Sequence, residues 1–199
     1  MSPSASLHDA TVVLDDRPVL RGVFFEVLPG LTLVRGANGA GKTTLLRALA
    51  GLVPLGRGTR SAESPPLYLG HRTMLLRGLS ARANLTFLAA FRGNAHPDVG
   101  VALARWGLQG VTDRPVERLS AGQRKRASLA RLDTEPAATV LLDEPFADLD
   151  AAGAALLRAA VRAAAAAGRA VVLVTHLADE LDADATHRFV VRDGAVRGA

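Results

Sequence analysis

A glycine-rich loop set between an apolar run and a helical segment constrains the fold of this chain more than any other feature. The apolar run Leu31–Arg35 leads directly into the loop Gly36–Thr44, and the loop leads into the helix-compatible segment Leu45–Ala50. This is the order of strand, loop and helix that a phosphate-binding motif requires. The alternative is a glycine-rich turn with a purely structural role, and the flanking elements favour the phosphate loop.

The residue types in this loop suit a bound polyphosphate. Glycines within it let the backbone curl so that successive N–H groups face the phosphates, and the helix start adds a positive dipole end. We expect Lys42 to neutralise β- and γ-phosphate oxygens and the Thr43 hydroxyl to ligate Mg²⁺. The residues expected to contact the nucleotide are Gly36, Ala37, Asn38, Gly39, Ala40, Gly41, Lys42, Thr43 and Thr44.

Two adjacent carboxylates follow a second apolar run. Thr139–Leu142 predicts a buried strand that delivers Asp143 and Glu144 at its carboxyl end, where ligands bind in parallel sheets. Asp143 is expected to hold the Mg²⁺ hydration shell, and Glu144 to polarise the attacking water as a general base. An isolated Asp-Glu pair would be a solvated loop feature, but the four apolar residues before it and the phosphate loop upstream favour the catalytic interpretation.

A third apolar run, Ala170–Val174, ends in Thr175 and His176. A lone histidine after a strand is more often structural than catalytic. At the same sheet edge as the phosphate loop, however, His176 can donate a hydrogen bond to the γ-phosphate or orient the attacking water. We therefore assign it to the catalytic group with Lys42 and Glu144.

The segment Leu119–Arg126 carries a helix start. Ser120 and Gln123 have the spacing of a capping box, so a helix is expected to begin here and run toward Leu132 with its N-terminal amides exposed. Taken alone, this pattern predicts a helix and nothing more.

The remaining pattern predicts an α/β fold with a mainly parallel sheet, because short apolar runs alternate with helix-length segments. The first two runs flank the polar turn Asp15–Pro18 and are expected to form an antiparallel edge. Pro54–Pro66, punctuated by glycine and proline, is either a loop or a degenerate strand. The expected strands are Thr11–Leu14, Val23–Val27, Leu31–Arg35, Leu67–Leu69, Thr139–Leu142, Ala170–Thr175 and Phe189–Arg192.

The 199 residues, 49% of them hydrophobic, suffice for one domain. From 72 to 118 the pattern turns helical, with Ala81–Phe91 and Asp98–Trp106 as the clearest helices. We therefore expect a single nucleotide-binding domain, 1–199, in which residues 1–71 and 119–199 form the catalytic core and residues 72–118 an inserted helical subdomain.

Composition narrows the possible partners and the location. The net charge of +5 is compatible with nucleic acid, anionic lipid or an acidic partner, but the arginines are scattered, which favours a solvated basic surface. The absence of cysteine excludes disulfides and fits a reducing cytoplasm. Residues 1–10 do not resemble a signal peptide, and no uncharged run reaches the roughly 18 residues that span a bilayer. Any membrane link is expected to come through a partner.

Leu119-Ser120-Ala121-Gly122-Gln123 resembles the signature motif of the ABC ATPases, and it stands in the family's order with the phosphate loop, Asp143-Glu144 and His176. The resemblance implies a P-loop ABC ATPase fold, ATP and Mg²⁺ as ligands, and a head-to-tail homodimer that encloses two ATP molecules. In such a dimer, the partner's ATP would be contacted by Ser120, Ala121, Gly122 and Gln123. Asp148 and Asp150 lie in a segment similar to the family's D-loop, which links the two sites across the interface.

Two departures from the family pattern concern the nucleotide. His71 stands where the family usually carries glutamine at the junction to the helical subdomain, and the adenine-stacking aromatic expected near Leu14 is absent. The missing aromatic leaves base selectivity open. His71 either contacts the Mg²⁺ water or couples the site to the subdomain, and the sequence does not decide between them.

Tyr68-Leu69-Gly70-His71, the stretch Leu79–Phe87 with its Asn84-Leu85 pair, the Leu-Ser-Ala-Gly-Gln signature and the short chain resemble the haem-exporter ATP-binding subunits of c-type cytochrome maturation. Ala83 replaces the glutamate usual there. The stretch Gly56–Pro66 is shorter than in most relatives, which predicts a reduced antiparallel β-subdomain. The resemblance implies an integral-membrane permease partner, a peripheral location on the cytoplasmic face of the cell membrane, and haem export or release of a haem-loaded chaperone. The alternatives are another ABC exporter, or a soluble ABC protein acting on nucleic acid or ribosomes; we expect no direct nucleic-acid contact.

Two smaller features have competing interpretations. Trp106 is either buried core of the helical subdomain, which we favour, or part of a groove for a membrane partner. The run Arg124–Arg126 either meets lipid or a partner, or forms a solvated helix face.

Overall fold

The computed structural model describes residues 3–176 and 181–199, so Met1, Ser2 and residues 177–180 of the expected domain lie outside the described part. The chain forms two compact units. The sheet unit comprises Met1–Gly70, Ala137–Pro145 and Val161–Ala199, and the helical unit comprises His71–Pro136 and Phe146–Ala160. Residues 119–136 and 146–160, which the sequence assigned to the catalytic core, thus fall in the helical unit. The reason is that the helix beginning after Ser120 packs with the neighbouring helices.

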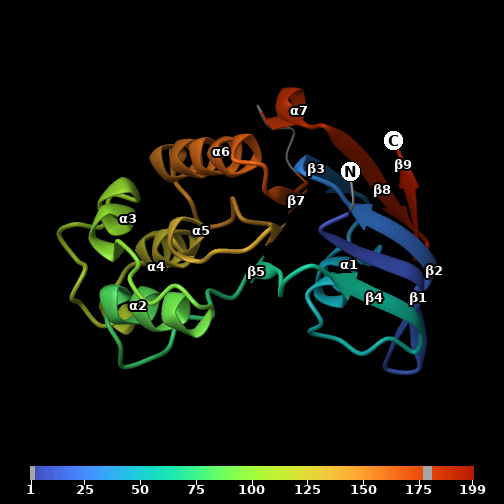
Figure 1. Ribbon diagram of the computed structural model, residues 1–199, viewed down its shortest axis with the longest axis horizontal. Helices are drawn as coiled ribbons and strands as arrows, with labels where there is room; N and C mark the ends of the chain where they lie inside the picture. The colour runs from blue at the N-terminus through green and yellow to red at the C-terminus, as the bar shows by residue number, and fades with distance from the viewer. Residues whose placement is uncertain (1–2, 177–180) are drawn as a thin grey trace. The chain divides into compact units, whose positions relative to one another are not determined.

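The elements of the described residues are labelled in Figure 1. In chain order they are β1 (Ala5–Leu14), β2 (Arg17–Val27), β3 (Gly30–Arg35), α1 (Lys42–Leu49), β4 (Arg57–Ala62), β5 (Leu67–Leu69), α2 (Ala81–Phe91), α3 (Val99–Arg105), the 3₁₀ turn η1 (Val116–Arg118), α4 (Ala121–Leu129), α5 (Arg131–Thr134), β6 (Thr139–Asp143), α6 (Ala151–Ala166), β7 (Ala170–Val174), α7 (Leu181–Asp184), β8 (His187–Arg192) and β9 (Ala195–Gly198).

The larger sheet has the strand order β5-β6-β7-β3-β8-β9. Neighbouring strands run parallel from β5 to β8, and only β9 pairs antiparallel. Every residue of β6 and β7 is buried, which is the continuous apolar pattern of a strand covered on both faces. The expected mainly parallel α/β sheet is confirmed.

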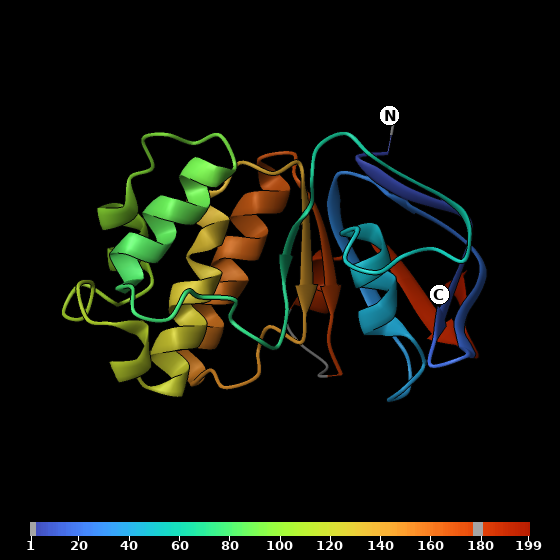
Figure 2. The ribbon, with the colours of Figure 1, turned by 90° about the horizontal axis from the view of Figure 1, so that it is seen from below.

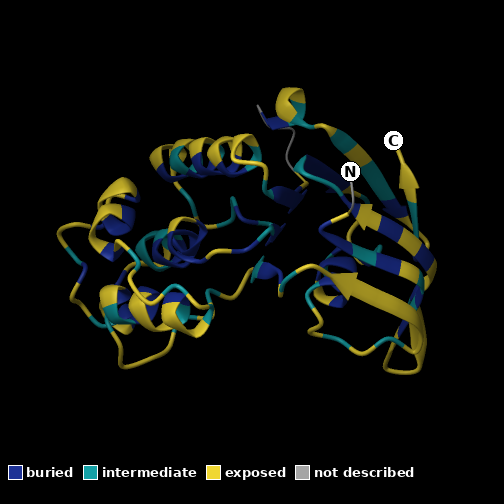
Figure 3. Cartoon of the chain, in the orientation of Figure 1, coloured by how far each residue is buried: buried dark blue, intermediate teal, exposed yellow. Residues whose placement is uncertain are grey.

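The smaller sheet is antiparallel, with the order β2-β1-β4. The expected pairing of the first two strands is confirmed, and both extend beyond the predicted runs. Residues 57–62, which the sequence left between loop and degenerate strand, form the strand β4, paired with β1 from Ala5↔Ala62 to Thr11↔Arg57 with one register shift. All six side chains of β4 are exposed (Figure 3), so no hydrophobic alternation marks it in the sequence.

Helix α1 packs between the two sheets of the sheet unit, as Figure 2 shows. Its buried face contributes Leu45, Leu46 and Leu49 to a core that includes Leu20 from β2 and Val172 from β7. This packing fixes the position of the loop that precedes α1, because the helix can move relative to neither sheet without opening the core.

The helical unit has a core of its own. Trp106, which is fully buried, donates from Nε1 to Asp133 Oδ2 at 2.7 Å, and this confirms the core interpretation of that residue. Helix α4 begins after Ser120 as predicted, but it ends at Leu129 and is followed by α5. Lys125 on α4 is only 3% exposed, so the solvated-face interpretation of the run 124–126 is wrong for its central residue. In the described part of the chain, no helix combines the length and apolar character needed to cross a membrane.

Candidate functional site

The loop between β3 and α1 is shaped by glycines at its two ends. Gly36 has a φ of 151°, and a Cβ there would lie 2.3 Å from the carbonyl oxygen of Val191. Gly41 has a φ of 106° and forms the N-cap of α1 in a left-handed conformation. No L-residue with a side chain fits either position without strain or displacement of the backbone. The loop therefore directs its backbone around a small concave space at the start of a helix.

Lys42 turns back over this loop. Its Nζ donates to the carbonyl oxygens of Gly36 and Ala37, each at 2.9 Å, and the residue is only 6% exposed. Desolvation lowers the pKa of Lys42, and the nearby carboxylates of Glu144 and Asp143 act in the opposite direction. A buried ammonium held mainly by neutral carbonyls is suited to exchange them for anionic phosphate oxygens.

Asp143 links the loop to the next strands of the sheet. It ends β6, is 4% exposed and accepts from two hydroxyls. Thr43 donates to Oδ1 at 3.1 Å, and Tyr68 of β5 donates to Oδ2 at 2.9 Å. The two residues expected to hold Mg²⁺ are thus in contact, whereas nothing in the sequence pattern assigned Tyr68 to the site.

Glu144 and His176 follow β6 and β7, which end side by side. The Glu144 backbone N–H donates to the Val174 carbonyl at 3.0 Å, with Glu144 at a φ of 48°. His176 Nε2 lies 3.1 Å from Glu144 Oε1. That oxygen is buried and accepts no well-aligned hydrogen bond from the described residues. An acceptor left in this state is available to a water molecule or to a substrate donor.

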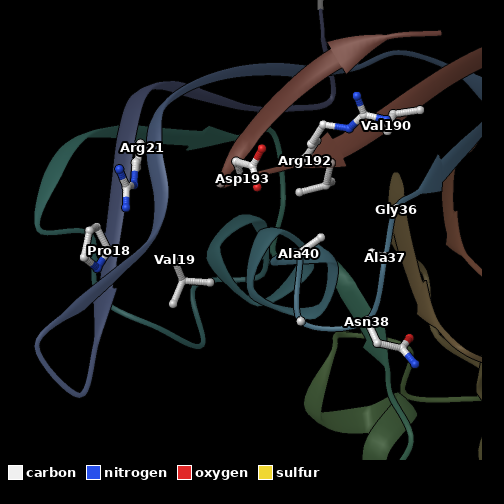
Figure 4. Close-up of a pocket in the computed structure, with 13 residues that line it drawn as sticks. Pro18, Val19, Arg21, Gly36, Ala37, Asn38, Ala40, Val190, Arg192 and Asp193 are labelled. Carbon is white, nitrogen blue, oxygen red and sulfur yellow. The ribbon is translucent and has the colours of Figure 1, made fainter.

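Two adjoining cavities border the loop, and Val19 lines both. The smaller, of about 340 Å³, is lined by Gly41–Thr44 of the loop and helix start together with Glu144 and His176. The larger, of about 570 Å³, lies between the loop, β2 and the β8–β9 turn. In Figure 4 it is surrounded by Val19 and Arg21 of β2, Asn38 and Ala40 of the loop, and Asp193 of the turn. None of the described residues that line it is aromatic.

The other predicted site residues belong to the helical unit. Ser120 and Gln123 form the expected capping box, with the Ser120 side chain accepting from the Gln123 N–H at 3.1 Å. Gly122 lies against the backbone of Asp148, whose carbonyl oxygen would be 3.3 Å from a Cβ at position 122. Asp150 accepts from the Gly153 N–H at 2.7 Å near the start of α6. His71 is exposed.

A family model described as "ABC transporter" matches residues 20–147, which include the loop, the capping box and the Asp-Glu pair. The chain belongs to the ABC transporter family. It is an ATP-binding ATPase of that family, and the P-loop fold expected from the sequence is confirmed.

Curated relatives and solved cassettes agree with this assignment. The chain is 41% identical to the cytochrome c biogenesis ATP-binding export protein CcmA of Xanthomonas axonopodis, with 87% of each chain covered. It is 47% identical to the CcmA of Rhodobacter capsulatus, with 86% of this chain and 80% of the relative covered. The dimeric, post-hydrolysis ATP-binding cassette MJ0796 bound to ADP and Pi superposes with a TM-score of 0.86 at 18% identity, covering 98% and 97% of the two chains, and shows the shared fold.

Proposed function

We propose that the chain is the ATP-hydrolysing subunit of an exporter that serves the maturation of c-type cytochromes. The relatives that are 41% and 47% identical over most of their length carry the name cytochrome c biogenesis ATP-binding export protein. In this role the subunit would bind an integral-membrane permease at the cytoplasmic face of the cell membrane and drive haem export or the release of a haem-loaded chaperone.

One observation carries the catalytic part of the proposal: the phosphate loop, Asp143, Glu144 and His176 meet at one edge of the parallel sheet. Loop amides and Lys42 would hold the β- and γ-phosphates, as electrostatic stabilisation of phosphoryl transfer requires. Glu144 would accept a proton from the attacking water through its buried Oε1, and His176, whose Nε2 lies 3.1 Å from that oxygen, would orient the water or donate to the γ-phosphate.

The residues present also fit a magnesium ion. The Thr43 hydroxyl and the Asp143 carboxylate lie 3.1 Å apart, and hydroxyl and carboxylate oxygens are the hard donors that Mg²⁺ prefers. Thr43 would ligate the ion directly and Asp143 through water. When bound, Mg²⁺ neutralises charge on the β- and γ-phosphates.

A head-to-tail homodimer would complete the site. Solved cassettes of the same fold carry titles that describe them as dimeric. In such a dimer the amides at the start of α4, with Ser120, would face the ATP held by the other subunit, because a capped helix start binds anions. Asp148 and Asp150 would link the two sites. His71 would contact the Mg²⁺ water or transmit the state of the site to the helical unit.

The substitution Glu144→Gln tests the catalytic assignment. Steady-state ATP turnover is expected to fall by about 10² to 10⁴, the usual contribution of a general base, while binding of a fluorescent ATP analogue is unchanged. Size-exclusion chromatography with ATP and Mg²⁺ is expected to show more dimer than the wild type, since hydrolysis no longer opens it. Glu63→Gln removes an exposed carboxylate of the same unit and serves as the matched control, with normal turnover. Undiminished turnover in Glu144→Gln would remove the general-base assignment.

Purification of the Glu144→Gln protein from its native membranes with ATP and Mg²⁺ tests the cellular role. Recovery of a multi-span membrane subunit together with cytochrome-assembly proteins is the expected result. An unrelated permease would keep the ATPase mechanism and overturn the cytochrome role, and ribosomes or nucleic acid would contradict the transporter role itself.

A further inference from the structure

Tyr68 makes a contact that neither the sequence pattern nor the proposed mechanism accounts for. It lies in the middle of the short strand β5, paired with Leu141 of the neighbouring strand β6. Its side chain extends along β6 toward the strand's carboxyl end and donates to Asp143 Oδ2 at 2.9 Å. Tyr68 is the one tyrosine of the chain, and a phenylalanine would fill the same space without making this bond.

Gly70 leaves the space in which the Tyr68 ring lies. A Cβ at position 70 would be 2.7 Å from the Tyr68 phenol oxygen and 2.8 Å from Cε1, and Cβ atoms in folded proteins do not come so close to other heavy atoms. Gly70 is not among the glycines with positive φ, so its backbone conformation does not demand glycine. Its lack of a side chain therefore serves the position of Tyr68.

The two oxygens of Asp143 are held by donors with different neighbours. Oδ1 accepts from Thr43, whose hydroxyl is also the group expected to turn toward Mg²⁺. Oδ2 accepts from Tyr68, which belongs to the sheet and not to the phosphate loop. When Thr43 engages the ion, the bond from Tyr68 still fixes the orientation of the carboxylate. Outer hydrogen bonds of this kind orient metal-binding carboxylates and tune their affinity.

We propose that Tyr68 is a positioning residue that holds Asp143 for Mg²⁺-ATP, and that Gly70 keeps the room this contact requires. The inference rests on the proposed role of Asp143 in holding the hydrated ion. It explains why tyrosine and glycine stand two residues apart before His71. The hydroxyl of Tyr68 makes the hydrogen bond, and the missing side chain of Gly70 leaves room for the ring.

The test measures binding of a fluorescent ATP analogue as free Mg²⁺ is varied, for Tyr68→Phe, Gly70→Ala and the double variant. Each single variant is expected to raise the half-maximal Mg²⁺ concentration about tenfold, the lower end of the loss seen for outer hydrogen bonds of metal sites. Analogue binding in EDTA is expected to be unchanged. The double variant should equal the single ones, because both substitutions remove the same hydrogen bond.

Two controls make the outcomes distinct. Gly56→Ala adds a methyl group elsewhere in the sheet unit, at an ordinary van der Waals distance of 3.7 Å from its nearest neighbours. It should leave the Mg²⁺ dependence of analogue binding unchanged. Asp143→Asn should strongly raise the half-maximal Mg²⁺ concentration. If Asp143→Asn has no effect, the proposed role of Asp143 fails and the inference fails with it. If Asp143→Asn shifts the midpoint but Tyr68→Phe does not, or if the two single shifts add in full, only the positioning role is overturned.

Discussion

The buried charged groups of the two units have different kinds of partner. In the helical unit, the Glu135 side chain is fully buried and forms ion pairs with Arg131 and with Arg92, the latter at 2.7 Å. In the sheet unit, the buried Lys42 donates to neutral loop carbonyls, and Glu144 Oε1 is buried without a well-aligned donor among the described residues. The first arrangement is satisfied within the chain. The second has the character of a binding site, and it supports the proposal that the phosphate loop holds the nucleotide.

The largest effect on stability is expected from a substitution in the buried ion pairs of the helical unit. Glu135→Ala leaves the guanidinium groups of Arg131 and Arg92 without their carboxylate in a buried setting, which costs about 3–5 kcal/mol when a buried pair is broken. Urea denaturation followed by circular dichroism measures the loss. As a control, Asp184→Ala removes one member of the exposed Arg162–Asp184 pair and should cost less than about 1 kcal/mol. Equal losses in both variants would contradict the comparison.

Lys42→Met tests the buried lysine of the sheet unit. It should weaken nucleotide binding without lowering the stability of the fold. Desolvation lowers the pKa of Lys42, so the folded state disfavours its charge at neutral pH, and loss of that charge should not destabilise the protein. The destabilisation that this shift represents is complete below the lowered folded-state pKa and is lost as pH rises from there through the unfolded-state pKa. Nucleotide binding should instead weaken by about 100-fold, roughly 2.7 kcal/mol, because the ammonium no longer meets the phosphates. If Lys42→Met instead lost as much stability as Glu135→Ala and kept its affinity for the nucleotide, the contrast between the two units would be contradicted.

The sequence predicted those parts of the site that lie within a few residues of one another. The loop 36–44, the Asp143-Glu144 pair and the Ser120 capping box are local patterns with their own chemistry, and the structure has the predicted elements at all three. The Tyr68–Asp143 contact spans 75 positions, and no spacing rule connects the two residues. It depends on the pairing of β5 with β6 and on the space left by Gly70, which only the folded chain shows.

The fold was predictable to a similar extent. Buried strands such as β6 and β7 are short runs of mostly apolar residues, and such runs in the sequence indicate them. Strand β4 forms through backbone pairing with β1 while its side chains stay exposed, and nothing in a polar, glycine-containing segment indicates it. Lys125 shows the converse, because a basic run does not reveal that its middle residue faces the interior.

The smallest expected effect concerns two serines of the helical unit whose hydroxyls make the same capping hydrogen bond. Ser80 accepts from the Ala83 N–H at the start of α2, and Ser120 accepts from the Gln123 N–H at the start of α4, each at 3.1 Å. Substitution of either by alanine should destabilise the unit by about 1 kcal/mol, the usual value of an N-cap. If Ser120 also meets the ATP of a partner subunit, Ser120→Ala should lower ATP turnover beyond what Ser80→Ala does at equal stability. Identical turnover in the two variants would leave Ser120 as a helix cap alone, because the capping contribution is matched and only the ligand contact differs.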